Sequence, residues 1–212
     1  MDAPDAAQAY ARADFSDSNS AFVQELLARH PHLRTVVDLG CGPGDIPIRL
    51  ARALRTVHVT AVDGSAAMLD LAREAVRAAG LTERVHLIQG RIPGLDLPEQ
   101  AFDAVLSKDM LHHLPDPHVL WQEALRLAKP GGVICVMDLV RPDSPVAARE
   151  IVERVAGREH PLLKEDFYYS LCAAFTPSEV RAQLAAVGLT LAVEQIGDRH
   201  MRIHGVLHAL AR

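Results

Sequence analysis

Short apolar runs that suit buried strands alternate with stretches of helical spacing through the first two thirds of the chain. A short apolar run bounded by turn residues predicts a strand, and apolar residues three or four positions apart predict a helix. Strands are predicted at 36–39, 57–63, 85–89, 101–107 and 133–140, and helices at 46–54, 66–79 and 118–128. This alternation favours a parallel sheet with right-handed crossovers and helices on both faces.

The last third of the chain predicts helices and a hairpin. Ser144-Pro145 begins a helix that runs to about Gly157, because serine caps a helix and proline is tolerated at its first position. Thr176-Pro177-Ser178-Glu179 is a capping box that opens a helix ending near Gly188. Residues 189–196 and 201–209 flank a short turn and predict a terminal antiparallel hairpin.

Residues 1–34 are expected to form an N-terminal helical cap. Ser18-Asn19-Ser20 could cap a helix over 21–28, and Tyr10 and Phe15 precede that helix. One interpretation is a frayed terminal helix, and the other is a flap over the mouth of an active site.

The most informative stretch is 36–45, where Asp38 ends a strand and Gly40, Gly42 and Gly44 follow at alternate positions. Glycine can take positive φ, and without a Cβ it lets a ligand approach the backbone. The N–H groups of the following helix start would face such a ligand. A dinucleotide fingerprint would need its third glycine at the position of Asp45, where an acid would repel a pyrophosphate.

Composition narrows the function classes. The 212 residues are 49% apolar, which indicates a globular chain, and no apolar run reaches membrane-spanning length. The acidic start lacks an apolar signal segment, and three widely spaced cysteines argue against a disulfide frame, so a cytoplasmic location is expected. The formal net charge of −5 and the low aromatic content favour a small-molecule partner over nucleic acid.

The glycine loop, with Asp38 in front of it, resembles motif I of the class I S-adenosylmethionine (SAM) dependent methyltransferases. Residues 111–116, Leu-His-His-Leu-Pro-Asp, resemble the motif after the fourth strand of small-molecule members, including the quinone-biosynthesis type. Pro130-Gly131-Gly132 before the fifth strand is also frequent in this family. The resemblance implies a Rossmann-like, doubly wound, mostly parallel seven-stranded α/β sheet with an antiparallel last strand, and a SAM-binding domain over 35–212.

The resemblance also implies methyl transfer from SAM to a small-molecule acceptor and a set of cofactor-binding residues. Asp38 and the glycines would hold the methionine end, Asp63 the ribose, and Gly90 to Ile92 the adenine. The full set is Asp38, Gly40, Gly42, Gly44, Asp63, Gly64, Ser65, Met68, Gly90, Arg91, Ile92 and Lys108.

Three of these positions have a competing interpretation. Asp63 ends the second strand, where an acid can accept hydrogen bonds from a ribose diol, but it could instead cap the next helix. Ser65 could equally supply that cap. Met68 fits the core side of the same helix and could also lie against the adenine edge.

Arg91 departs from the family pattern. An acid usually stands there in the resembling family and accepts from the adenine amino group, whereas arginine has no acceptor. The adenine would then be recognised through backbone carbonyls, through Gln89 or by packing on Ile92.

The acceptor is expected after the fourth strand, because ligands lie at the carboxyl ends of parallel strands. Asp109, His112 and His113 are the candidate general bases, with His200 as a more remote one. A base is needed only if the acceptor carries a proton. The two adjacent histidines cannot both face inward on a helix, so one would be structural.

Two other interpretations concern the histidines. A shared metal ion is a rival explanation for Asp109, His112, His113 and His118, but no further ligand motif supports it, and no metal is predicted. His200, His204 and His208 fall on one face and alternate with apolar residues, which favours a solvated face.

Residues 141–175 form an insert outside the resemblance that carries two of the three tyrosines. It could be a pocket wall or lid, or a helix packed on the sheet edge. Two other functions stay open: an NAD(P)-dependent oxidoreductase, which Asp45 disfavours, and a non-catalytic SAM-binding module. The sequence fixes neither the acceptor atom (O, N, S or C) nor the oligomeric state, for which a homodimer is one option.

Overall fold

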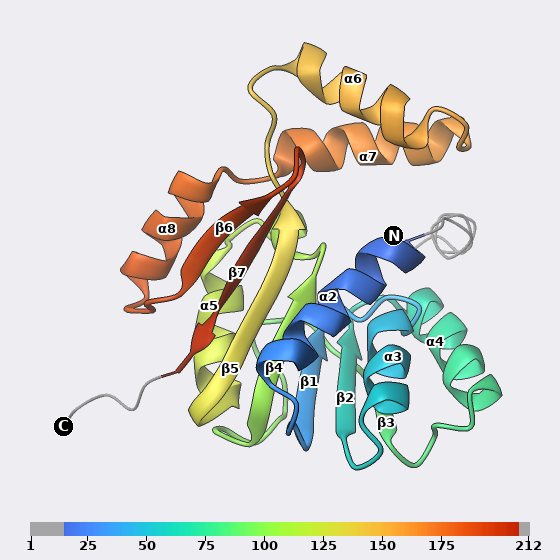
Figure 1. Ribbon diagram of the computed structural model, residues 1–212, viewed down its shortest axis with the longest axis vertical. Coiled ribbons are helices and arrows are strands. Elements are labelled where there is room, and N and C mark those ends of the chain that lie inside the picture. Colours follow the sequence, from blue (N-terminus) through green and yellow to red (C-terminus); the bar gives the residue numbers. More distant parts are fainter. Residues whose placement is uncertain (1–14, 208–212) are drawn as a thin grey trace.

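The computed structural model describes residues 15–207, built around one seven-stranded sheet (Figure 1). Its strands are β1 (Thr35–Leu39), β2 (His58–Asp63), β3 (Val85–Gln89), β4 (Phe102–Lys108), β5 (Ala128–Leu139), β6 (Ala192–Ile196) and β7 (His200–Val206). They lie in the order β3-β2-β1-β4-β5-β7-β6. Strands β1 to β5 are parallel, and β7 is antiparallel to both neighbours. The predicted doubly wound sheet with an antiparallel last strand is confirmed.

Helices cover both faces of the sheet. They are α2 (Ser16–Arg29), α3 (Asp45–Ala53), α4 (Ala66–Ala78), α5 (His118–Leu127), α6 (Pro145–Ala156), α7 (Pro161–Ala173) and α8 (Pro177–Ala186), with a 3₁₀ turn η1 (Leu111–His113). Helices α2, α3 and α4 pack on one face, and α5 and α8 on the other (Figure 1). Within residues 15–207, no helix is both long enough and apolar enough to cross a bilayer.

Strand residues alternate between two cores. Val36 and Val37 are both fully buried, but they belong to opposite sides of the sheet, as the period of two requires. On the α5 side, the indole N–H of Trp121 donates to Gln183 Oε1 of α8 at 3.0 Å. The Trp121 side chain is buried in the apolar core, and this hydrogen bond satisfies its only polar atom.

The predicted helix starts after residue 140 are confirmed. Ser144 Oγ accepts from Ala147 N at 3.1 Å, and Pro145 is the first residue of α6. In α8 the capping box is complete, because Thr176 Oγ1 accepts from Glu179 N and Glu179 Oε2 accepts from Thr176 N. The predicted terminal hairpin is present as β6 and β7.

The predicted cap of the N-terminal helix is wrong. Helix α2 begins at Ser16, so Asn19 and Ser20 lie inside the helix. Asn19 Nδ2 donates to Asp45 Oδ2 at 2.8 Å, and Arg49 Nη1 donates to Ser20 Oγ at 2.6 Å. These polar side chains connect α2 to α3 instead of capping their own helix. Tyr10, which was expected to precede the helix, lies outside the described residues.

The predicted break before the fifth strand is also wrong. Strand β5 begins at Ala128 and contains Pro130-Gly131-Gly132. The pairing with β4 shifts between Phe102 and Ala104, so a bulge absorbs these residues without ending the strand. Gly131 N donates to Leu207 O and Leu207 N donates to Gly132 O, both at 2.7 Å, which joins the bulge to the end of β7.

The insert at 141–175 is a helical pair that lies beyond the carboxyl ends of the strands (Figure 1). Helix α7 packs on α6 and on η1. A separate small core joins the pair to the sheet through Leu139 of β5 and Leu171 of α7. The insert therefore stands above the sheet, next to the turn that carries His112 and His113.

Candidate active site

The loop between β1 and α3 adopts a backbone that only glycine takes without strain. The φ angle is +79° at Gly40, +52° at Gly42 and +87° at Gly44. Gly40 is enclosed, since an added Cβ would lie 2.7 Å from Met110 Sδ. Gly42 is open, with no atom within 4 Å of an added Cβ, so a ligand can approach its backbone.

A cavity of about 240 Å³ lies in front of this loop. Five of the predicted site residues line it, namely Asp38, Gly40, Gly42, Lys108 and Asp109. The cavity is at the carboxyl ends of β1 and β4, where the strand order reverses, and the first turn of α2 forms part of its wall. This switch point is the usual ligand position in an open α/β sheet.

Asp38 is a buried acid with an unsatisfied oxygen. It is 1% exposed, and its Oδ2 has no hydrogen-bond partner. Burial, together with the negative charge of Asp63, raises the pKa of Asp38 to about 7, although Lys108 acts in the opposite direction. A buried carboxylate oxygen without a partner is costly, so this atom is suited to a ligand that donates.

Lys108 and Asp109 form an ion pair at the end of β4. Asp109 has a φ of +56°, which is strained for a residue with a side chain, and its N–H donates to Met137 O at 2.9 Å. Burial favours protonation of Asp109, but Lys108, His200 and His112 outweigh it and lower its pKa. Its Oδ1 is buried without a partner, like the Asp38 oxygen.

Asp63 reaches back to the glycine loop from the end of β2. Its Oδ2 accepts from Gly42 N and its Oδ1 from Ser65 N, both at 2.8 Å. Ser65 is the N-cap of α4, since its Oγ accepts from Met68 N at 3.3 Å. Met68 is 3% exposed, which supports the core interpretation and leaves little of it for a ligand.

Gly64, Gly90, Arg91 and Ile92 are brought together at the ends of β2 and β3. Gly90 N donates to Asp63 O at 3.0 Å. A Cβ on Gly64 would lie 3.1 Å from Arg91 Cγ, so the arginine stem rests on the Gly64 backbone. The arginine side chain therefore lies against Gly64, the residue after Asp63.

The two adjacent histidines have different environments, as the sequence predicted. His113 is exposed, while His112 is buried with its Nδ1 2.7 Å from Asp138 Oδ1. Asp138 Oδ2 accepts from Leu111 N at 2.7 Å. Burial acts to lower the pKa of His112, but the Asp138 hydrogen bond and the charges of Asp138 and Asp109 raise it above the ordinary value.

Asp138 was missed in the sequence. It is an acid near the carboxyl end of an apolar strand, and the same signal identified Asp38 and Asp63. The carboxyl ends of the parallel strands all lie on the same side of the sheet. An acid at the carboxyl end of an apolar strand is therefore a candidate site residue.

The solvated face expected for the β7 histidines is wrong. His200 is half-buried, and burial is the main reason that its pKa is lowered. The side chain of His204 is 16% exposed and lies 3.5 Å from Glu194 Oε1. Helix α2 covers this face, where its Glu25 pairs with Arg202. His208 lies outside the described residues.

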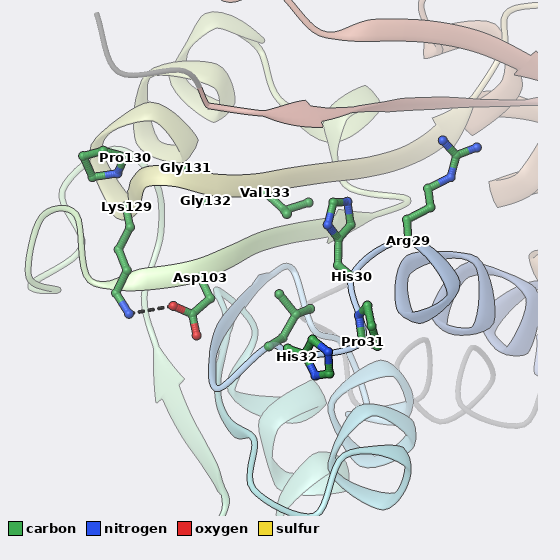
Figure 2. A pocket seen from close by; sticks show the side chains of 11 residues that line it. Arg29, His30, Pro31, His32, Asp103, Lys129, Pro130, Gly131, Gly132 and Val133 are labelled. Carbon is green, nitrogen blue, oxygen red and sulfur yellow. Dashed lines mark hydrogen bonds and ion pairs between the residues drawn. The ribbon is translucent and has the colours of Figure 1, made fainter.

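A second cavity, of about 340 Å³, lies at the opposite ends of the strands, near the start of β4 and β5. Figure 2 shows Lys129 pointing from the start of β5 to the carboxylate of Asp103. Lys129 Nζ donates to Asp103 Oδ1 at 2.7 Å. Asp103 also accepts from the N–H groups of Arg34 and Thr35. None of the predicted site residues lines this cavity, and among residues 15–207 no cluster of three His, Cys, Asp or Glu could hold a metal.

Comparisons with known proteins agree with this geometry. A family model described as a methyltransferase domain matches residues 36–132, which contain the glycine loop, His112 and His113. The chain also superposes on a SAM-dependent methyltransferase from Aquifex aeolicus with a TM-score of 0.72 and 20% identity, over 97% of this chain and 98% of that one. Residues 36–132 are therefore similar in sequence to a methyltransferase domain, and the chain shares the fold of a SAM-dependent methyltransferase.

The names of the curated relatives state different acceptors. The chain is 33% identical over 169 residues to trans-aconitate 2-methyltransferase of an Azoarcus species, over 75% of this chain and 64% of that protein. It is 36% identical over 121 residues to demethylmenaquinone methyltransferase of Lactiplantibacillus plantarum, over 57% and 50%. The chain spans 44% to 64% of the length of such relatives.

Proposed function

We propose that this chain binds SAM at the glycine loop and transfers its methyl group to a small-molecule acceptor that carries a proton. One observation carries the proposal: Asp38 Oδ2 and Asp109 Oδ1 are buried carboxylate oxygens without partners, on two residues that line the same cavity. SAM carries an ammonium and a sulfonium, so a cation that donates hydrogen bonds would complete this site. A pyrophosphate would instead be repelled, and the oxidoreductase alternative is not favoured.

Residues of the cavity and of the neighbouring ends of β2 and β3 would contact different parts of the cofactor. Asp38 would accept from the ammonium, and the open backbone at Gly42 would face the methionine carboxylate. Asp63 keeps one lone pair on each oxygen for the ribose hydroxyls, after its bonds to Gly42 and Ser65. Gly40, Gly44 and Gly64 would let the backbone lie close to the cofactor. Gly90, Arg91 and Ile92 would frame the adenine.

SAM supplies a methyl group that is already activated, so the chain has to align the acceptor, exclude water and remove a proton. His112 is the best base among the three candidates. The Asp138 carboxylate can only accept, so His112 Nδ1 carries a hydrogen and Nε2 is free to take the acceptor proton. Asp138 is a positioning residue, because it acts through the imidazole.

Asp109 and His113 have other roles in this proposal. Lys108 holds Asp109 ionised, which makes it a weak base but a good electrostatic partner for a sulfonium and for protonated His112. His113 is exposed and has no bond to an acid in the described structure, so it serves as the matched control for His112.

The domain division is part of the same proposal. Residues 35–212 would form the SAM-binding domain, and residues 1–34 a cap whose helix α2 reaches the cavity through Phe15, Ser16 and Asn19. The helical pair α6–α7 would form a wall of the acceptor pocket, since α7 packs on η1.

Location and assembly remain predictions. Cys41, Cys135 and Cys172 are all free, which fits a reducing compartment such as the cytoplasm. We expect a small-molecule acceptor rather than nucleic acid. A measurement of the molecular mass in solution tests the prediction of a homodimer.

The test uses the purified chain with SAM and four acceptor kinds: phenols or alcohols, carboxylic acids, amines and thiols. Formation of S-adenosylhomocysteine is measured. We expect turnover of hydroxyl acceptors, and a loss of roughly 100-fold in kcat in His112→Gln, the usual contribution of a general base. His113→Gln should keep near wild-type kcat.

Two outcomes contradict the proposal. Preferred turnover of carboxylates with an unaffected His112→Gln would remove the general base from the mechanism. SAM binding without turnover of any acceptor would support the non-catalytic module instead.

A further inference from the structure

Arg91 follows the end of β3, which lies beside Asp63, the acid proposed above to hold the ribose. Strands β2 and β3 pair in parallel with Asp63 opposite Gln89, and Gly90 N donates to Asp63 O. The residue after Gly90 is therefore placed beside the acid proposed to hold the ribose. A base attached to that ribose would reach the end of β3 next.

The arginine side chain is laid across the backbone at this point. An added Cβ on Gly64 would lie 3.1 Å from Arg91 Cγ and 3.3 Å from Arg91 Nε. Contacts this short are tighter than ordinary van der Waals packing, so the absence of a side chain at Gly64 lets the arginine stem and the start of the guanidinium lie close to this residue. Arg91 is itself exposed, so part of its side chain lies at the surface.

The chemistry of arginine selects the kind of contact. A guanidinium has five donors and no acceptor, so it cannot receive a hydrogen bond from an exocyclic amino group. It is planar and delocalised, and it stacks on aromatic faces through cation–π and π interactions. The structure thus offers a flat cation at the adenine position instead of an acceptor.

We propose that Arg91 holds the purine of the cofactor by stacking, with Gly64 as the residue that allows it, and that the chain does not read the 6-position of the base through this residue. The proposal deepens the SAM-binding function proposed above and rests on it. It makes Arg91 a binding residue whose loss would affect a 6-amino and a 6-oxo purine alike.

The test is calorimetric titration of the full chain with S-adenosylhomocysteine and with S-inosylhomocysteine, which carries oxygen in place of the amino group. Wild type should bind both within about threefold, because stacking does not distinguish them. Arg91→Ala should weaken the affinity for both ligands about three- to thirtyfold, which is the range expected for loss of a cation–π contact. Arg91→Asp, which restores an acceptor, should prefer the adenosyl compound by roughly tenfold.

Two further variants make the test specific. Gly64→Ala should reproduce the loss seen in Arg91→Ala, and the double variant should lose little more, because both changes remove one contact. Gly64 does not have positive φ, so the added methyl tests the contact and not the backbone. Arg73→Ala removes an exposed arginine of α4 that pairs with Asp70, and it should leave both affinities unchanged.

Three outcomes are decisive. A wild-type preference of tenfold or more for the adenosyl ligand would overturn the proposal and point to an acceptor such as Gln89. Wild-type affinity in Arg91→Ala would also overturn it. If wild type binds neither ligand, the proposed function itself has failed, and that result is distinct from the other two.

Discussion

The Nδ1 atom of His112 lies 2.7 Å from Oδ1 of Asp138, and the two side chains are 3% and 1% exposed. The other carboxylate oxygen accepts from Leu111 N, so the acid is fixed by the backbone of the turn that carries the histidine. A buried acid in this arrangement sets the tautomer of the imidazole and stabilises its protonated form. We therefore expect the His112–Asp138 pair to determine how turnover depends on pH.

Asp138→Asn should separate the two effects of the acid. His112 must be neutral to accept a proton, and its pKa is raised in the folded protein. Wild-type kcat should therefore rise with pH through a value above 6.5, the ordinary histidine pKa. Asparagine removes the charge, so this limb should move to lower pH, while kcat falls on the order of 100-fold or more. A pH–rate profile with an unmoved limb would show that His112 does not control it.

Cofactor affinity should depend on the protonation of Asp38. The pKa of about 7 means that Asp38 is largely protonated at pH 6 and ionised at pH 8. The ammonium of S-adenosylhomocysteine favours the ionised acid, so binding of this ligand should release a proton. Its affinity should rise by up to about tenfold for each pH unit as the pH increases toward 7. Titrations at pH 6, 7 and 8 in two buffers of different ionisation enthalpy measure both effects. Asp38→Asn should bind weakly and without this pH dependence.

The same acid should cost stability. A folded pKa of about 7, raised from 3.8, means that the unfolded chain loses its proton first as the pH rises. Stability is then lost between about pH 4 and pH 7, by up to about 4 kcal/mol. Asp38→Asn should be more stable than wild type in urea at pH 8 and nearly equal at pH 4. Equal stability at pH 8 would contradict the burial argument.

Features that depend on neighbouring residues in the sequence were predicted, and contacts between residues far apart in the sequence were not. The glycine loop was predicted because its glycines have local backbone requirements, and φ is positive at all three. The partner of His112 was missed because Asp138 is 26 residues away, and only the meeting of β5 with η1 brings them together. No local pattern contains that contact.

The errors have the same origin. Asn19 and Ser20 were assigned to a cap, but they bond to Asp45 and Arg49 across an interface between helices. His200 and His204 were assigned to solvent, because the periodicity of β7 does not show that α2 covers that face. In both cases tertiary contacts overrode a correct local preference.

Gly40 and Gly80 form a matched pair for the glycine loop. Both have positive φ, +79° and +67°, so alanine should cost each about 1–2 kcal/mol of backbone strain. Only Gly40 faces a neighbour, Met110 Sδ, 2.7 Å from an added Cβ, whereas an alanine Cβ at Gly80 meets nothing within 4 Å. Gly40→Ala should therefore be less stable than Gly80→Ala and lose ligand binding, which Gly80→Ala should keep. Urea unfolding and titration of both variants give the comparison.

The most direct test of the account is calorimetric titration of the purified chain with SAM, S-adenosylhomocysteine and NAD, repeated on Asp63→Ala. Both adenosyl compounds should bind and NAD should not. Loss of the ribose hydrogen bonds to a charged acceptor should weaken binding at least about tenfold in the variant, with unfolding in urea as the control for its bonds to Gly42 and Ser65. Binding of NAD alone, or of none of the three, would contradict the assignment of the cavity at the glycine loop to SAM.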